Sequence, residues 1–261
     1  MKRAFLSELM FPPKCVGCSE RLSSFEDSFD GGYAFCINCR AEWEREKLNA
    51  CPTCRVAAIE CTCRPEILDK KYIDCVSLVK FGRAQSVDGL IYSLKKRKIR
   101  KNFDFASSEL AKRFLTYSEK TERDISDAIF TNVPRKRTSI ARFGFDHAKI
   151  LAKMTAKKVG HPYEELIFRR GDGKDQKKLT LKERSENVKG SFELAIEGKI
   201  NEKTVVLVDD VVTSGNTALE CMKILRAGGA KNVVLLSIAH ASEKKKAKRK
   251  RRAGRKNSKK D

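Results

Sequence analysis

The chain has 261 residues and a formal net charge of +22, because 56 lysines and arginines outnumber 34 acidic residues. Hydrophobic residues make up 41% of it and apolar runs recur, which excludes wholesale disorder. No run approaches the ~20 apolar residues that a membrane span needs. A basic protein attracts polyanions such as nucleic acid, although the same charge also serves as a solubilising surface.

The N-terminal residues bear on where the protein works. Glu8 interrupts the apolar stretch there and no small-residue cleavage site follows, which is not the pattern of a signal peptide. We therefore expect a cytoplasmic protein. In such a reducing compartment cysteines bind metal more often than they form disulfides.

Eight of the ten cysteines lie between residues 15 and 63, in four closely spaced pairs. Two thiolates two residues apart can chelate one ion from a tight turn, and two such turns complete a tetrahedral four-sulfur shell for zinc. The spacing predicts two structural zinc sites in a double zinc ribbon over residues 1–66. The simplest arrangement joins the first two pairs and the last two, but a crossed pairing and a disulfide framework stay open. The predicted ligands are Cys15, Cys18, Cys36, Cys39, Cys51, Cys54, Cys61 and Cys63.

Residues 127–133 predict a strand, and a short basic loop follows it. The loop consists of Pro134, Arg135, Lys136 and Arg137, whose cationic side chains could neutralise a diphosphate. A basic loop after a strand is weak evidence by itself.

The apolar run at 205–208 predicts a buried parallel strand, which Asp209 and Asp210 follow. A short loop then leads into a predicted helix at 218–227, which Gly228 ends. Ligands of open α/β sheets bind beyond the carboxyl ends of the strands. The pattern therefore predicts a ligand site at this strand end.

The loop itself suits a phosphate. A helix N-terminus offers free backbone N–H groups to a phosphate, Gly215 allows the backbone to approach closely, and Thr213, Ser214 and Thr217 add hydroxyl donors. The two aspartates would repel phosphate, so we expect them to face the hydroxyls of a sugar or a sugar-bound Mg²⁺. The segment predicts a phosphorylated sugar with adjacent free hydroxyls as its ligand.

This segment matches the 5-phosphoribosyl 1-diphosphate (PRPP) signature of type I phosphoribosyltransferases. The resemblance implies a Rossmann-like α/β phosphoribosyltransferase domain over residues 67–242 that binds PRPP with Mg²⁺. In that family the acidic pair holds the ribose hydroxyls, which makes Asp209 and Asp210 the expected catalytic residues, and a loop after an earlier strand grips pyrophosphate, here residues 134–137. The expected PRPP-binding residues are Val208, Asp209, Asp210, Val211, Thr213, Ser214, Gly215, Asn216 and Thr217.

The two modules together resemble the ComF family of competence proteins, over residues 4–241. The start at 6–15 is similar to the family's L-x-x-L-x-F-P-x-x-C pattern, and residues 176–192 are similar to its Q-x2-L-x4-R-x2-N-x2-G-x-F block. The chain departs from the family where Asp146 and His147 replace an Asn-Gln pair. We expect His147 to have a capping or surface role.

The resemblance implies a protein that handles single-stranded DNA during natural transformation, together with other proteins of the DNA-uptake machinery. Two alternatives stay open. One is a salvage phosphoribosyltransferase, whose chemistry needs positioning and Mg²⁺ electrostatics rather than a protein nucleophile. The other is a regulator that senses PRPP without turnover.

Two further segments are strongly basic or polar. Residues 169–178 predict a mobile loop over phosphates or nucleic acid, or else a plain solvated loop. The tail at 243–261 carries 12 lysines and arginines against two acidic residues, so we expect it to be disordered and to bind nucleic acid in a salt-dependent manner.

Overall fold

The computed structural model describes residues 14–22, 34–65, 67–68, 73–170, 190–195 and 198–241. The predicted mobile loop lies outside these residues apart from Arg169 and Arg170, and the predicted basic tail lies outside them altogether.

Four parallel strands form the central sheet, in the order β1-β6-β5-β2. They are β1 (Ile73–Phe81), β2 (Ile129–Asn132), β5 (Thr204–Val212) and β6 (Asn232–Ala241). A parallel sheet that is buried on both faces requires nearly continuous apolar runs, as these strands have. The strands predicted at 127–133 and 205–208 are confirmed as β2 and β5. However, β5 continues to Val212, so Asp209 and Asp210 belong to the strand itself.

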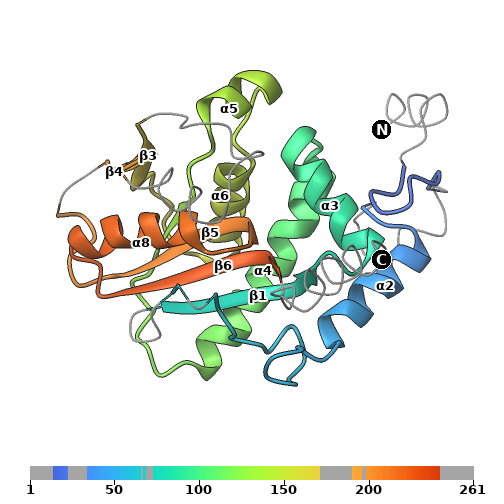
Figure 1. Ribbon diagram of the computed structural model, residues 1–261, viewed down its shortest axis with the longest axis horizontal. Coiled ribbons are helices and arrows are strands. Elements are labelled where there is room, and N and C mark those ends of the chain that lie inside the picture. The colour runs from blue at the N-terminus through green and yellow to red at the C-terminus, as the bar shows by residue number, and fades with distance from the viewer. Residues whose placement is uncertain are drawn as a thin grey trace, which may run out of the picture.

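Helices cover both faces of the sheet (Figure 1). One core holds side chains of α3 (Gln85–Lys96), α4 (Arg100–Lys120) and α6 (His147–Val159), and the other holds those of α8 (Asn216–Ala227). Successive residues of a strand point to opposite faces, so Val206 and Val208 enter the first core while Val205 and Leu207 enter the second. The predicted helix at 218–227 is confirmed as α8, which begins two residues earlier and ends at Gly228.

Three short elements lie near the upper edge of the molecule in Figure 1. Helix α5 (Arg137–Phe143) precedes α6, and strands β3 (Ile167–Arg169) and β4 (Phe192–Leu194) form an antiparallel pair. The predicted basic loop therefore extends from the end of β2 to the start of α5.

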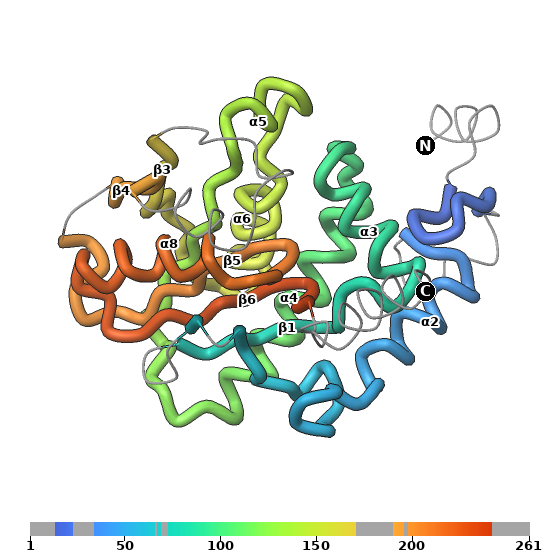
Figure 2. The backbone as a smooth tube through the Cα atoms, viewed as in Figure 1, coloured from blue at the N-terminus to red at the C-terminus, as the bar shows by residue number. Residues whose placement is uncertain are grey.

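The cysteine-rich segment packs into the first core. Its helix α2 (Ile37–Leu48) lies against α3 and β1 (Figure 2). The rings of Phe35 and Trp43 meet the Phe105 ring of α4 edge-on, with centroids 5.2 and 5.5 Å away. The fully buried Trp43 also donates its indole N–H to Glu109 of α4 at 3.1 Å. One hydrophobic core therefore spans the boundary predicted at residues 66 and 67, and the division into domains stays a prediction.

Candidate functional site

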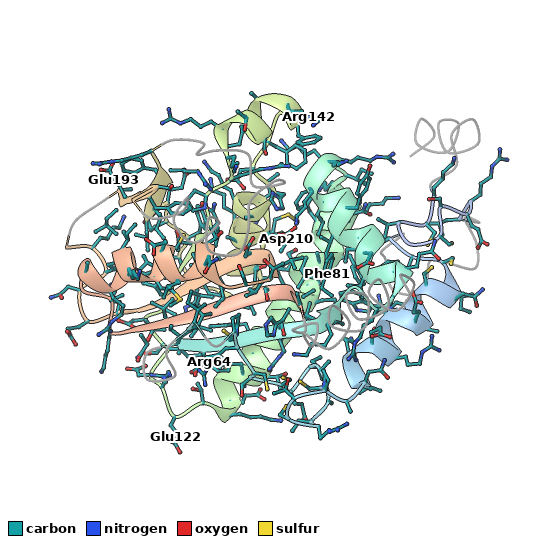
Figure 3. All side chains as sticks on the ribbon, in the orientation of Figure 1. Arg64, Phe81, Glu122, Arg142, Glu193 and Asp210 are labelled. Carbon is teal, nitrogen blue, oxygen red and sulfur yellow. The ribbon has the colours of Figure 1, made fainter. Side chains whose placement is uncertain are left out.

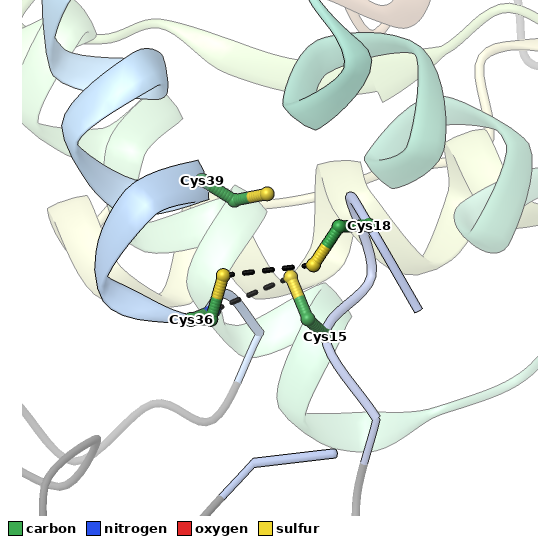
Figure 4. A group of neighbouring side chains, drawn as sticks. All are labelled: Cys15, Cys18, Cys36 and Cys39. Atoms are coloured by element: carbon green, nitrogen blue, oxygen red, sulfur yellow. Dashed lines mark hydrogen bonds between the residues drawn. The ribbon is translucent and has the colours of Figure 1, made fainter. Parts of the chain in front are cut away.

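The first cysteine cluster joins two segments of the chain. Cys15 and Cys18 flank a turn, whereas Cys36 and Cys39 lie at the start of α2. Their sulfur atoms point toward one another and all lie within 4.8 Å (Figure 4). The sulfurs of Cys18 and Cys36 are 3.6 Å apart, and the backbone N–H of Cys36 donates to the sulfur of Cys15 at 3.3 Å.

The second cluster consists of Cys51, Cys54, Cys61 and Cys63, again with all sulfurs within 4.8 Å. The sulfurs of Cys54 and Cys61 are 3.6 Å apart. Lys80 of β1 is buried and donates from Nζ to the sulfur of Cys61 at 3.4 Å, so an ammonium group offsets part of the thiolate charge. The sheet thus contributes to the surroundings of this cluster.

Both clusters fit a tetrahedral metal. Zn–S bonds of about 2.3 Å place the sulfurs of a tetrahedron about 3.8 Å apart, close to the 3.6 Å found in each cluster. All ten cysteines are free, which contradicts a disulfide framework, and the simplest pairing is confirmed. Burial tends to raise the pKa of Cys51, but the N–H groups of Cys54 and Thr53, the Cys61 side chain and the Lys80 charge together lower it to about 6, which favours a ligating thiolate.

The acidic pair, Asp209 and Asp210, lies near the carboxyl end of β5 at the centre of the molecule, where Figure 3 labels Asp210. The backbone N–H of Asp210 donates to Oδ1 of Asp209 at 2.8 Å, and the N–H of Val211 donates to Oδ1 of Asp210 at 2.9 Å. Each carboxylate thus has one oxygen fixed by the main chain. The second oxygen of each remains for other partners.

Two groups from other elements reach Asp210. The Nζ of Lys95, at the end of α3, lies 3.0 Å from Oδ2 of Asp210, and the Nε2 of His147, at the start of α6, lies 3.3 Å from the same oxygen. The sequence prediction for His147 was wrong. Asp146 caps α6 by accepting from the N–H groups of Ala148 and Lys149, while His147 is buried behind it. Because α6 begins beside the carboxyl end of β5, its first side chain, His147, points toward Asp210.

The two carboxyl groups have different electrostatic surroundings. Burial tends to raise the pKa of Asp210, but the Lys95 ammonium group and the neighbouring His147 imidazole hold it below its ordinary value. Burial and the neighbouring Asp210 charge raise the pKa of Asp209 well above its ordinary value. The cations beside Asp210 and the carboxylate beside Asp209 thus move the two pKa values in opposite directions.

Arg135 of the basic loop is engaged by the protein itself. Its guanidinium donates to the carbonyl of Phe145 at 2.9 Å and to that of Lys95 at 2.6 Å, and it stacks on the Phe143 ring with 4.9 Å to the centroid. Its backbone N–H donates to Oδ2 of Asp146 at 3.1 Å. These contacts fix the loop next to the end of α3.

A cavity of about 350 Å³ brings the basic loop and the acidic pair together. Of the predicted site residues, Val208, Ser214, Gly215, Asn216 and Arg137 are not part of its wall. Sequence reasoning missed Phe81 and Lys95, whereas Arg169 is the first residue of the segment predicted to lie over phosphates. Lys95 occurs in a basic stretch, but nothing in that stretch distinguishes it from its neighbours. The cavity is lined by Phe81, Lys95, Val133, Pro134, Arg135, Lys136, His147, Arg169, Asp209, Asp210, Val211, Thr213 and Thr217.

Gly215 caps α8 with a φ of +79°, in the left-handed region. A β-carbon there would lie 3.0 Å from Cβ of Pro65 and 3.1 Å from Cγ2 of Ile67. The segment that follows the second cysteine cluster therefore packs directly on the predicted phosphate loop.

Comparison with known proteins finds similar sequences. A model of the phosphoribosyl transferase domain matches residues 139–260, which include β5, the acidic pair and α8. Competence protein ComFC of Streptococcus pneumoniae is 22% identical over 206 residues, covering 78% of this chain and 86% of the relative. Competence protein F of Haemophilus influenzae is 30% identical over 102 residues, covering 38% of this chain and 44% of the relative. The chain is similar to competence proteins of the ComF family, and it carries a phosphoribosyl transferase domain.

The sheet accordingly has the type I phosphoribosyltransferase fold, preceded by two four-cysteine clusters. The aligned part spans less than half of the Haemophilus influenzae relative. Among solved structures, a purine phosphoribosyltransferase from Pyrococcus horikoshii Ot3 is 20% identical, with 54% of this chain and 75% of that chain covered and a TM-score of 0.33. That likeness is too weak to carry an argument. Within the described residues, every helix is too short or too polar to cross a bilayer.

Proposed function

We propose that this ComF-like protein binds PRPP with Mg²⁺ in the cavity between the basic loop and the acidic pair, that its two cysteine clusters hold zinc, and that it binds single-stranded DNA in DNA uptake during natural transformation. The observation that carries the PRPP proposal is the cavity itself. It joins carboxylates for sugar hydroxyls with cations and hydroxyls for phosphates, although these residues come from four separate parts of the chain.

Each group has a distinct role in the proposed complex. Asp209 and Asp210 would accept hydrogen bonds from the ribose hydroxyls through the oxygens that the main chain leaves available. Thr213 and Thr217 would donate to the 5-phosphate at the N-terminus of α8. Lys136 would face the diphosphate, because the guanidinium of Arg135 is already held by two backbone carbonyls.

Carboxylate oxygens beside a diphosphate suit Mg²⁺, which prefers oxygen ligands and keeps several waters. When bound, it would neutralise the diphosphate charge. A transferase, a sensor and a DNA-handling protein would all bind PRPP, and turnover distinguishes the enzyme from the sensor. Incubation with PRPP, Mg²⁺ and candidate bases, with pyrophosphate release as the readout, separates an enzyme from a sensor.

Calorimetric titration with PRPP and Mg²⁺ tests the binding proposal. Asp209→Asn and Asp210→Asn keep the side-chain shape but remove the charge, and each should abolish measurable binding. Asp124→Asn is the matched control, because Asp124 is exposed, lies outside the cavity and accepts hydrogen bonds from Ser126 through its carboxylate. Affinity that is equal in all three variants and the natural protein would refute the assignment.

A further inference from the structure

His147 brings a nitrogen donor to the acidic pair. One ligand atom from each of His147, Asp209 and Asp210 lies within 4.8 Å of the other two. The three residues come from the start of α6 and the end of β5, and all three line the same cavity. The spacing of the donors is that of ligands around one ion.

The histidine also lacks a conventional partner. Only 9% of its side chain is exposed, and neither ring nitrogen has an aligned hydrogen bond within the described part of the chain. Its Nε2 is nevertheless 3.3 Å from Oδ2 of Asp210, and its Nδ1 is 4.0 Å from Oδ1 of Asp146. Buried polar atoms are nearly always bonded, and one that is not calls for an ion or water as its partner.

The chemistry of this donor set separates it from a Mg²⁺ site. Mg²⁺ prefers oxygen ligands alone and keeps much of its water. An imidazole nitrogen raises the affinity for first-row transition metals, whereas carboxylates still accommodate Mn²⁺. One histidine with two carboxylates therefore favours a transition-metal dication.

Lys95 contacts one of the carboxylate oxygens that such an ion would bind. Its ammonium group lies 3.0 Å from Oδ2 of Asp210, and the lysine side chain is 42% exposed. A half-exposed side chain on a flexible stem can turn toward solvent. The ammonium thus balances the acidic pair until a dication replaces it.

We propose that His147, Asp209 and Asp210 form a binding site for a first-row transition-metal dication, with Mn²⁺ as its probe, which displaces the ammonium group of Lys95. The site is complete without PRPP, so its failure and the failure of PRPP binding are separate results. The nitrogen donor makes the site selective for such metals over Mg²⁺.

Electron paramagnetic resonance of Mn²⁺ added to the full, zinc-loaded chain without PRPP tests the proposal. Thiolates prefer zinc to Mn²⁺, so the cysteine clusters do not compete. The natural protein should bind one Mn²⁺ with nitrogen-14 coupling from an imidazole, and Mg²⁺ should displace it only in excess of about tenfold. Absence of binding, absence of nitrogen coupling, or displacement by an equal concentration of Mg²⁺ would overturn the proposal.

Three variants locate the site. His147→Gln should lose the nitrogen coupling and weaken Mn²⁺ binding by about tenfold or more, with circular dichroism to verify folding. Lys95→Met should strengthen binding, because the competing cation is gone. His161→Gln is the control, since His161 contacts the Ala128 carbonyl away from the cavity. Nitrogen coupling that survives in His147→Gln, or weaker binding in Lys95→Met, would contradict the proposed site.

Discussion

Gly215 is the position where a single methyl group should affect both halves of the protein. Its φ of +79° costs an alanine about 1–2 kcal/mol in the left-handed region. The new β-carbon would also meet Pro65 at 3.0 Å and Ile67 at 3.1 Å, closer than ordinary carbon contacts. Overpacking of this kind costs about 1–3 kcal/mol. We therefore expect Gly215→Ala to lower the free energy of unfolding by about 2–5 kcal/mol.

Gly160→Ala separates the two contributions. Gly160 has a φ of +75°, but a β-carbon there would meet nothing within 4 Å. That variant should lose only the backbone part, about 1–2 kcal/mol, in urea unfolding. In Gly215→Ala either the predicted phosphate loop or Pro65 must move. The affinity for PRPP should therefore fall about tenfold in this variant, which corresponds to about 1.4 kcal/mol. In Gly160→Ala the affinity should stay unchanged. Equal losses of stability in the two variants would refute the packing argument, and unchanged PRPP affinity would refute its link to the loop.

Three further predictions address the metal clusters, pH and the tail. Zinc chelation should shift the fluorescence emission of Trp43 to longer wavelength. Trp43 is the single tryptophan of the chain and is fully buried in the core that also holds the first cysteine cluster. Emission that stays constant while zinc leaves would contradict a structural role of the metal. Burial and the charge of Lys80 lower the pKa of His240 from 6.5 to about 4. Between pH 6.5 and pH 4 the imidazole is therefore protonated in the unfolded chain but not in the folded one. The free energy of unfolding consequently decreases as the pH falls through this range. The loss should reach about 2 kcal/mol at pH 5, and His240→Gln should remove it from the difference in urea unfolding free energy between pH 7 and pH 5. Loss of zinc at low pH would affect the natural protein and the variant equally. An unfolding free energy that depends on pH identically in both would therefore contradict the role of His240. Deletion of residues 243–261 should weaken single-strand binding at low salt and reduce the salt dependence of its affinity, and an unchanged slope would exclude the tail from DNA binding.

The local features of the site were predictable from the sequence. Cysteine spacing predicts both clusters because two ligands from one turn are fixed by chain geometry. The apolar run at 205–208 and Gly228 locate β5 and α8 because strand burial and helix termination are local properties. Contacts between elements were not predictable. Lys95 reaches Asp210 across more than a hundred residues of sequence, and His147 is turned inward only because α6 begins beside β5.

Arg135 shows the same limit in another way. Its charge in the sequence indicates anion binding, yet its guanidinium is satisfied by the carbonyls of Lys95 and Phe145. Composition predicts how many cationic side chains a segment carries, but not which of them donate hydrogen bonds to backbone carbonyls. That choice is made by the packing of α3 against the loop.

The edge-on rings of Phe35 and Trp43 against Phe105 have a practical consequence for anyone dissecting the protein. A fragment that starts after residue 66 would expose Phe105 and leave Glu109 without its indole donor. Such an uncovered aromatic face invites aggregation. Biochemical work on the phosphoribosyltransferase-like part should therefore retain the cysteine-rich part, because its removal would take away side chains that complete the core.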